Sequence, residues 1–426
     1  MLEIINAVLW AVATALINLS GIYFGRKLSF PQFNFKKIFK SLLKSNHKGV
    51  TPIKTLFLTL AGRIGVGSIA GVALAIYVGG PGTIFWMWII ALISAVLAYC
   101  ETLMAIKYKR VINNQNIGGP FYYIKDGVKN KYLAVLYAFI IIVAYLFGFI
   151  PIQANTITKS IGSNNNYIFI GLVLAFITYK IIKGGISKII KVTDKIVPVM
   201  TLFYVGLVLY VIFTNLNSFV DIFLLIINDA FKLKPFFTGF LLTIIIGIER
   251  GIFSNESGLG IGAIATSASS ESSGVKIGYI QVLGVYITTI VICTATAFMI
   301  LMFNYSTLNI ASPNGIEVTK AAFSFHFGSL GSMFLVICIL MFAFSTILTG
   351  FYYCQSSLSF LKDKADLYMI TFLTPISVFI GSVTSPTIIW NLIDILVAVL
   401  TFINIYALLC LKNEIIEYHR QYDRDV

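Results

Sequence analysis

Eleven long apolar runs restrict what this chain can fold into more than any other feature of its sequence. A segment needs roughly 20 apolar residues to cross the hydrocarbon core of a bilayer. Lipid offers the backbone no hydrogen bonds, so a spanning segment is a helix or belongs to a closed barrel. The short alternating segments of a barrel do not occur in the sequence. We therefore predict an all-α, polytopic membrane protein with about 11 transmembrane helices. The runs start near Ile5, Thr55, Thr83, Tyr132, Tyr167, Ile196, Phe236, Ile277, Ser329, Leu367 and Thr387.

The composition excludes several classes of protein. Apolar residues make up 58% of the chain and charged residues 11%, whereas a soluble domain has about 45–50% and about 25%. So few charges cannot form a wettable surface, which excludes a soluble enzyme, a nucleic-acid-binding module and a disordered scaffold. The chain has no H-E-x-x-H or G-x-S-x-G motif, so we expect no enzymatic activity.

The basic residues predict an orientation in the membrane. The formal net charge is +14, with 31 Lys and Arg. If the chain changes sides at each run, 25 of these residues fall on the side of the loop between the first two runs. Basic residues concentrate in cytoplasmic loops, so we expect the N-terminus outside and the C-terminus in the cytoplasm. The excess charge then suits anionic lipid, and we expect no nucleic-acid partner. The four basic residues on the other side are Lys159, Lys232, Lys234 and Lys320.

Two of the runs, at residues 62–71 and 247–260, are interrupted by Gly, Ser and Asn. A glycine costs a helix about 1 kcal/mol relative to alanine. Interrupted segments at matching positions of two halves indicate a transporter binding site near the midplane of the bilayer. The two runs lie five apart, so we infer an inverted repeat. The expected units are an N-terminal helix and basic loop (1–54), a first five-helix repeat (55–215), an extracellular connector (216–235), a second repeat (236–411) and a cytoplasmic tail (412–426).

Six charged residues lie within the apolar runs. A charge at the centre of a bilayer is costly, so these side chains should pair or face water. We expect five of them to form a charge network or gate, with any role as ligands second: Arg63, Glu101, Arg250, Glu256 and Asp394. The sixth is Glu249.

Several motifs, in order along the chain, resemble those of the alanine or glycine:cation symporter family. The most specific is Phe-Ser-Asn-Glu-Ser-Gly-Leu-Gly at 253–260, preceded by Arg-Gly at 250–251. The others lie at 61–73, 79–88, 118–124, 153–155 and 342–348. The resemblance runs from Thr55 to past Asp394 and implies a LeuT-type fold of ten core helices plus one extra N-terminal helix. It also implies sodium-driven uptake of a small neutral amino acid, such as alanine or glycine, across a bacterial inner membrane.

The chain departs from the family pattern near the interruptions. Arg63 stands where a small hydroxyl residue is usual, and Ser68 where Asn is usual. Ile261-Gly262-Ala263 replaces the usual Ser-Ala-Pro. These changes fall in the region of the site, so they bear on the substrate and the coupling ion more than on the fold.

An amino-acid zwitterion needs donors for its carboxylate and acceptors for its ammonium group, and the ends of broken helices provide both. Glycines allow close approach of the backbone, and sodium prefers oxygen ligands. The resemblance implies that Gln153 and Phe253 wall the pocket. It also implies ion ligands from the hydroxyls of Ser345 and Thr346 and the carbonyls of Ala61 and Ile64. We expect no other cofactor and no protein partner. The expected substrate-binding residues are Gly65, Gly67, Ser68, Gln153, Phe253, Ser254 and Asn255.

The role of Arg63 stays open between two hypotheses. Its guanidinium replaces a bound cation or meets an acidic group on the substrate, or it pairs with Glu101, Glu256 or Asp394 away from the substrate. The first hypothesis allows a transporter that is proton-coupled or sodium-independent. A channel and an amino-acid sensor are the rival classes of protein. The glycines of the two interrupted runs suit a closed binding pocket with alternating access, which favours a carrier over a channel. No cytosolic signalling domain is expected, which argues against a sensor.

Overall fold

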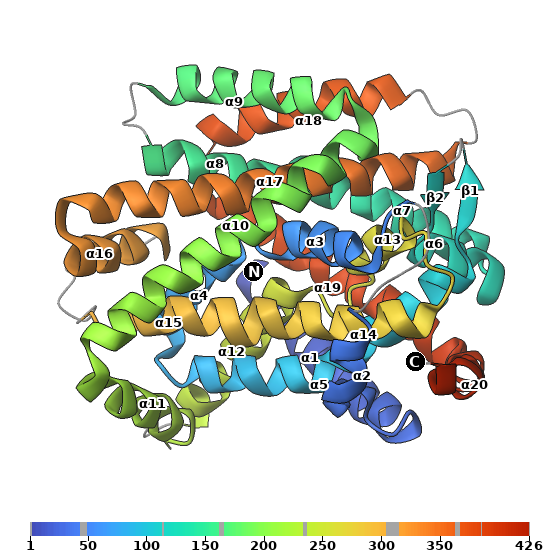
Figure 1. Cartoon of the computed structure of the whole chain (residues 1–426), viewed down its shortest axis with the longest axis horizontal. Coiled ribbons are helices and arrows are strands. Elements are labelled where there is room, and N and C mark those ends of the chain that lie inside the picture. The colour runs from blue at the N-terminus through green and yellow to red at the C-terminus, as the bar shows by residue number, and fades with distance from the viewer. Residues whose placement is uncertain are drawn as a thin grey trace.

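The computed structural model describes residues 2–42, 49–112, 115–161, 166–232, 237–303, 315–362, 367–384 and 386–425. Each of the eleven predicted runs falls on a helix or on a series of helical segments (Figure 1). Among the described residues, seven helices are long and apolar enough to cross a membrane, and three shorter apolar helices accompany them. The uninterrupted helices are α1 (Leu2–Lys27), α5 (Thr83–Lys107), α9 (Tyr167–Ile182), α10 (Gly185–Thr214), α17 (Gly331–Leu361), α18 (Leu367–Val383) and α19 (Pro386–Cys410).

Four runs are divided into segments. Two of them contain a π-helical turn without a break: α7 (Lys131–Ala144), η4 (Tyr145–Phe149) and α8 (Ile150–Ile161); and α14 (Gly274–Val285), η6 (Tyr286–Cys293) and α15 (Thr294–Leu301). The other two are broken: α3 (Pro52–Arg63), η2 (Val66–Ser68) and α4 (Ala70–Gly79); and α12 (Phe237–Asn255) and α13 (Ile261–Ser267). Both breaks predicted from the glycine-rich sequence are therefore present.

Short elements connect the long helices. The single hairpin among the described residues pairs β1 (Arg110–Ile112) with β2 (Gln115–Ile117). The helical connections are η1 (Pro31–Phe33), α2 (Phe35–Lys40), α6 (Pro120–Tyr122), η3 (Tyr123–Gly127), α11 (Leu216–Ala230), α16 (Gly315–Phe327) and η8 (Gly328–Leu330). After the last long helix come α20 (Lys412–Tyr422) and η9 (Asp423–Asp425).

One predicted boundary was wrong by about three turns. The sixth run was expected to start near Ile196, but α10 begins at Gly185, so Lys188 and Lys191 lie on the helix and not in a loop. Hydropathy marks the apolar part of a helix, whereas hydrogen bonding continues into polar sequence beyond it.

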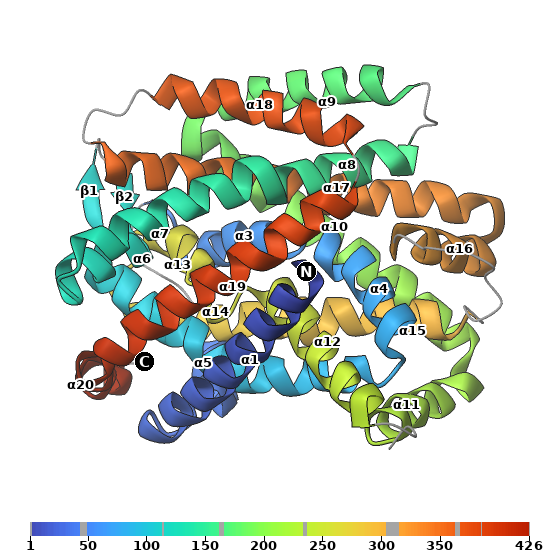
Figure 2. The same cartoon turned by 180° about the vertical axis from the view of Figure 1, so that it is seen from behind.

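The helices form two layers around the breaks. α9 and α18 pack together at one face, with α8 and α17 beneath them (Figure 1). On the other side, α5 packs against α12 and α14, and α3 lies between α14 and α17. The view from behind shows α1 crossing next to α19, and α1 also contacts α5 (Figure 2).

The outer faces of these helices are apolar. On α9, Phe169, Leu172 and Phe176 are exposed while Leu174 is buried. Exposing an apolar surface of this size to water is unfavourable, whereas in a membrane the same surface contacts lipid tails. The fold is that of a multi-pass membrane protein.

Candidate substrate and ion site

The two breaks meet in the middle of the molecule. The Ser68 Oγ of the first break lies 3.2 Å from the Ser254 Oγ at the end of α12. Ser254 Oγ is also 3.0 Å from Cys293 Sγ at the end of η6, and the Thr296 hydroxyl donates to the Ser68 carbonyl at 2.8 Å. Both serines are buried. The breaks thus form one polar centre together with the eighth spanning segment.

The backbone of the first break lies tightly against α8 and α17. The Val66 amide donates to Gln153 Oε1 at 3.0 Å. A Cβ on Gly65 would lie 2.8 Å from Thr346 Oγ1 and 3.0 Å from the Gln153 amide. Glycine at position 65 therefore lets the backbone lie close to α17, because a Cβ would clash with the Thr346 hydroxyl.

Aromatic rings cover one side of this centre. The Phe253 ring stacks on Phe149 at a centroid distance of 5.5 Å and lies 5.1 Å from the Trp390 ring. A Cβ on Gly67 would lie 2.7 Å from the Phe253 ring. Phe253 therefore packs directly onto the first break, between two other aromatic residues.

The four predicted ion ligands come together between α3 and α17. Thr346 Oγ1 lies 3.0 Å from the Ala61 carbonyl oxygen and 3.5 Å from that of Ile64. Ser345 Oγ lies 3.4 Å from the Ala61 carbonyl oxygen. Both hydroxyls also donate to the Phe342 carbonyl, at 2.9 Å and 3.0 Å. The five oxygens are a donor set that suits a hard cation such as sodium, at a helix end whose dipole also favours positive charge.

The second break is held by hydrogen bonds to its own backbone. Glu101 Oε1 accepts from the amides of Gly258 and Gly260, at 2.8 Å and 3.1 Å, and from Asn404 Nδ2 at 2.8 Å. Asn255 Oδ1 accepts from the Ser257 amide at 2.9 Å. Gly258 and Gly260 have φ values of +89° and +81°, which favour glycine. Glu101 and Asn255 thus satisfy amides that the interruption leaves free.

The second break also contains Glu256, a non-glycine residue with a positive φ of 56°. Its Oε1 accepts from the Tyr145 hydroxyl at 3.3 Å. A residue in this conformation is strained, and such strain persists where the surrounding structure holds it in place.

A second group of charges lies beside the aromatic rings. The Arg250 guanidinium is 2.8 Å from Glu249 and 3.5 Å from Asp394. It also lies over the rings of Trp390 and Phe253, at 5.3 Å and 5.9 Å. Arg250 therefore links α12 to α19 directly over Phe253.

Arg63 lies apart from that group. It is 4% exposed, and its Nη1 donates to the Gln281 carbonyl at 3.4 Å. Among the described residues no carboxylate oxygen lies within 4.0 Å of its guanidinium, and its electrostatic partners are Glu256 and Glu101 at longer range. A Cβ on Gly262 or Gly284 would lie 2.6 Å or 2.8 Å from the guanidinium nitrogens. The guanidinium thus fits a slot between α13 and α14 that two glycines leave open.

A model of the sodium:alanine symporter family matches residues 1–426. The chain belongs to this family. It is 33% identical to the amino-acid carrier protein AlsT of Bacillus subtilis, over 94% of this chain and 87% of the relative. It is 31% identical to the sodium/alanine symporter AgcS of Methanococcus maripaludis, over 98% and 95%. Another relative is the probable sodium/glutamine symporter GlnT of Bacillus subtilis, at 33% over 99% and 90%.

The crystal structure of MhsT in complex with L-phenylalanine has the same fold. It matches with a TM-score of 0.63 and 12% identity, over 85% of this chain and 89% of that chain. The predicted LeuT-type arrangement with two broken helices is thus confirmed, and the chain is an amino-acid:cation symporter by family.

The sequence did not identify several polar partners in this symporter's centre. The type of residue at position 342 could not identify its carbonyl as a ligand, because every residue has a backbone carbonyl. Cys293 and Gln281 lie in an apolar run whose π-helical turn shifts the helical register, and no sequence signal marked that turn. The capping role of Glu101 could have been suspected, since a buried carboxylate needs donors and a broken helix offers amides.

Proposed function

We propose that the protein is a secondary active transporter that carries a small neutral amino acid, such as alanine or glycine, together with sodium. The observation that carries this proposal is the contact of the two breaks at Ser68 and Ser254, next to the oxygens of Ala61, Ile64, Ser345 and Thr346. Two relatives, AgcS and AlsT, are named a sodium/alanine symporter and an amino-acid carrier.

In this mechanism the substrate lies along the first break. The Gly67 amide and the amides at the start of α13 bind the carboxylate, and Gly65 allows close approach of the backbone. Carbonyls and the hydroxyls of Ser68 and Ser254 bind the ammonium group. Gln153, Phe253 and Asn255 complete the pocket. Phe253 limits the room for the side chain, which suits a small amino acid.

Sodium couples the two layers of helices. Its proposed ligands come from α3 in one layer and α17 in the other. An ion bound by both helices favours the conformation in which they are close, and a ligand shifts such an equilibrium only through this difference in affinity. Helices of both repeats, 55–215 and 236–411, contribute to each layer. We propose that one bundle of helices rocks about this site. The charge network or gate then consists of Arg250 with Asp394, and of Arg63 with Glu101 and Glu256.

The proposed location is a bacterial inner membrane, with the N-terminus outside and the C-terminus in the cytoplasm. The concentration of basic residues on one side of the chain supports this orientation. The partners are then the amino acid, the ion and the lipid bilayer.

Uptake of radiolabelled alanine by the purified protein in liposomes tests the proposal. We expect accumulation under an inward sodium gradient, little uptake without it, and counterflow when unlabelled alanine is preloaded. A channel would show no counterflow, and a sensor would show binding without uptake. Absence of alanine and glycine uptake under both sodium and proton gradients would overturn the proposal.

A second candidate is a transporter of the same fold that is proton-coupled or sodium-independent, with Arg63 in place of a bound cation. The observation that favours it is a buried guanidinium with no carboxylate within 4.0 Å among the described residues. In that case uptake persists without sodium and becomes sodium-dependent in Arg63→Thr. Full sodium-driven uptake that is unchanged in Arg63→Thr would exclude this candidate.

A further inference from the structure

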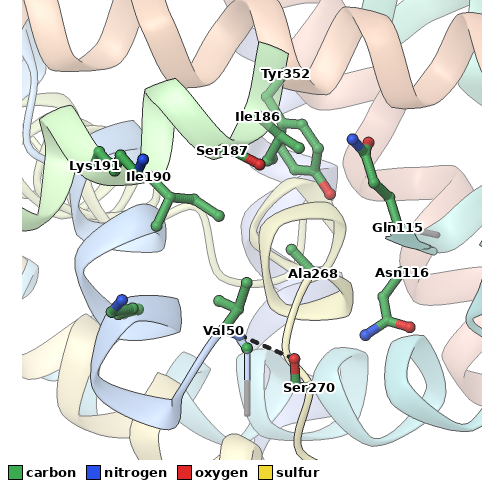
Figure 3. A pocket seen from close by; sticks show the side chains of 12 residues that line it. Val50, Gln115, Asn116, Ile186, Ser187, Ile190, Lys191, Ala268, Ser270 and Tyr352 are labelled. Atoms are coloured by element: carbon green, nitrogen blue, oxygen red, sulfur yellow. Dashed lines mark hydrogen bonds between the residues drawn. The ribbon is translucent and has the colours of Figure 1, made fainter. Parts of the chain in front are cut away.

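A cavity of about 320 Å³ lies beside the start of α3, separate from the centre where the breaks meet. Its walls come from α3, α10, the β hairpin, the end of α13 and α17 (Figure 3). Three of these elements, α3, α13 and α17, also form the candidate substrate and ion site. Tyr352 in the wall follows Thr346 by six residues, about 9 Å along α17. The cavity therefore lies between the candidate site and the surface that carries Lys54 and Lys191.

One wall of the cavity presents an uncompensated positive charge. Lys191 is exposed, and among the described residues no acidic side chain lies within 4.0 Å of it. Lys54 also lines the cavity, but its Nζ is 3.7 Å from Asp194, which partly offsets its charge. The α10 wall thus attracts a carboxylate through Lys191.

The facing walls present oxygen atoms. Tyr352 is 3% exposed and its ring projects into the cavity (Figure 3). Ser267 and Ser356 interact with its hydroxyl, whose oxygen has room to accept a further hydrogen bond. Asn116 donates through Nδ2 to the Ser269 carbonyl at 2.9 Å, which leaves its amide oxygen as an acceptor.

We propose that this cavity is a transit site for the zwitterionic amino acid, between the central site and the aqueous phase on the basic side of the molecule. Lys191 binds the carboxylate, and the oxygens of Tyr352 and Asn116 accept from the ammonium group. The inference rests on the proposed function, because it needs the protein to carry an amino acid.

A transit site on one side gives the transporter a side-specific affinity. Substrate arriving from the basic side meets the cavity first, whereas substrate from the opposite side meets the central site first. The overall free-energy change of transport fixes the ratio of Vmax/KM for transport from the basic side to Vmax/KM for transport from the opposite side. A variant that changes KM on the basic side alone must therefore change Vmax for transport from that side by the same factor.

Alanine transport in membrane vesicles of both orientations tests the proposal. Lys191→Gln removes the charge and Tyr352→Phe removes only the hydroxyl. We expect each to raise the KM for alanine in inside-out vesicles by roughly tenfold, the loss expected for one hydrogen bond to a charged group. The KM in right-side-out vesicles should be unchanged. Lys188→Gln is the matched control, because Lys188 is exposed on the same helix, outside the cavity, with its Nζ bonded to the Lys180 carbonyl at 2.8 Å.

An unchanged KM in inside-out vesicles, or an equal rise in both orientations, overturns the transit site. The same result follows if Lys188→Gln has the effect of Lys191→Gln, since the effect is then one of surface charge. If the unmodified protein transports alanine in neither orientation, the proposed function fails instead, so the two failures are distinguishable.

Discussion

The Thr346 hydroxyl is the side-chain group that most directly tests the proposed ion site, because it contacts carbonyls of both Ala61 and Ile64. Thr346→Val keeps the shape and removes the oxygen. We expect the sodium concentration for half-maximal alanine uptake to rise by roughly tenfold. The maximal rate at saturating sodium should change less. The measurement is uptake in liposomes over a series of sodium concentrations.

Thr349→Val is the control, since the Thr349 hydroxyl donates within its own helix, to the Ser345 carbonyl at 3.0 Å. We expect its sodium dependence to match that of the unmodified protein. An unchanged sodium dependence in Thr346→Val would contradict the assignment.

Gly262 and Arg63 should be energetically coupled. Gly262→Ala puts a Cβ 2.6 Å from the Arg63 guanidinium and should lower the melting temperature, because the slot cannot hold both groups. In an Arg63→Thr background the added methyl group meets no guanidinium, and we expect little effect. Thermal unfolding of the four proteins measures this coupling. Gly71→Ala is a control, since none of the atoms that the structure describes lies within 4 Å of its added Cβ. Equal losses in both backgrounds would show that the slot does not depend on Arg63.

The proposed ion ligands came from the family resemblance and not from side-chain chemistry, because Ser and Thr are common in membrane helices. The resemblance at 342–348 pointed to Ser345 and Thr346, and the structure brings their hydroxyls to the carbonyls of α3. The surroundings of Arg63 could not be predicted. Its slot depends on Gly262 and Gly284, and spacing along one chain does not show which glycines from two helices face a third.

At the scale of elements, the break in the seventh run depends on Glu101. Its carboxylate satisfies two amides of the break and the Asn404 side chain. Glu101→Ala should destabilise the protein by about 3 kcal/mol, and Glu101→Gln, which keeps an acceptor oxygen, by about 1–2 kcal/mol. Thermal unfolding in detergent is the measurement. Equal stability of the two variants would show that the hydrogen bonds at the break are not what Glu101 contributes.

Sequence predicted the existence of the breaks well, because Gly, Ser and Asn clustered within an apolar run disfavour a continuous helix. It predicted element ends and internal turns poorly. α10 begins at Gly185 because the helix continues past the apolar part through Lys191 and Lys188. The π-helical turns at 145–149 and 286–293 lie in largely apolar sequence. Their position is decided by packing against neighbouring helices, which local pattern does not encode.

At the scale of the whole molecule, the fold class was predictable because lipid offers the backbone no hydrogen bonds. A long apolar run that spans the bilayer must therefore form a helix, which satisfies its own backbone groups. The docking of the C-terminal helix was not predictable. In the structure, α20 packs against α5, with Ile415 and His419 buried. This contact joins the tail to the helices that surround the site.

The docking of α20 should weaken in mild acid because of His419. The Tyr99 hydroxyl lies 2.8 Å from His419 Nδ1. Burial lowers the pKa of His419 below its ordinary value of 6.5, Lys37 and Arg420 act in the same direction, and the Asp423 carboxylate opposes them. The docked state therefore disfavours the protonated ring. The contribution of neutral His419 to docking is fully present above pH 6.5. It is lost as the pH falls from 6.5 through the lower pKa that His419 has in the docked state.

Asp423 acts at lower pH. Partial burial favours its neutral form, but hydrogen bonds from Lys37 and Tyr279 outweigh this and hold the pKa of Asp423 below its ordinary value of 3.8. Its contribution is lost only as the pH falls below that value, so a change in mild acid belongs to His419.

Hydrogen exchange of the amides at 412–422 measures this docking. We expect their protection, corrected for the intrinsic rate, to be constant above pH 6.5, the ordinary pKa of histidine, and to fall as the pH is lowered below that value. His419→Gln cannot take up the proton, so its protection should be independent of pH over this range. Protection that falls equally in both proteins would assign the change to another group. Protection that rises in acid would contradict the sign of the His419 shift, because a tail that prefers neutral histidine must release as the ring gains charge.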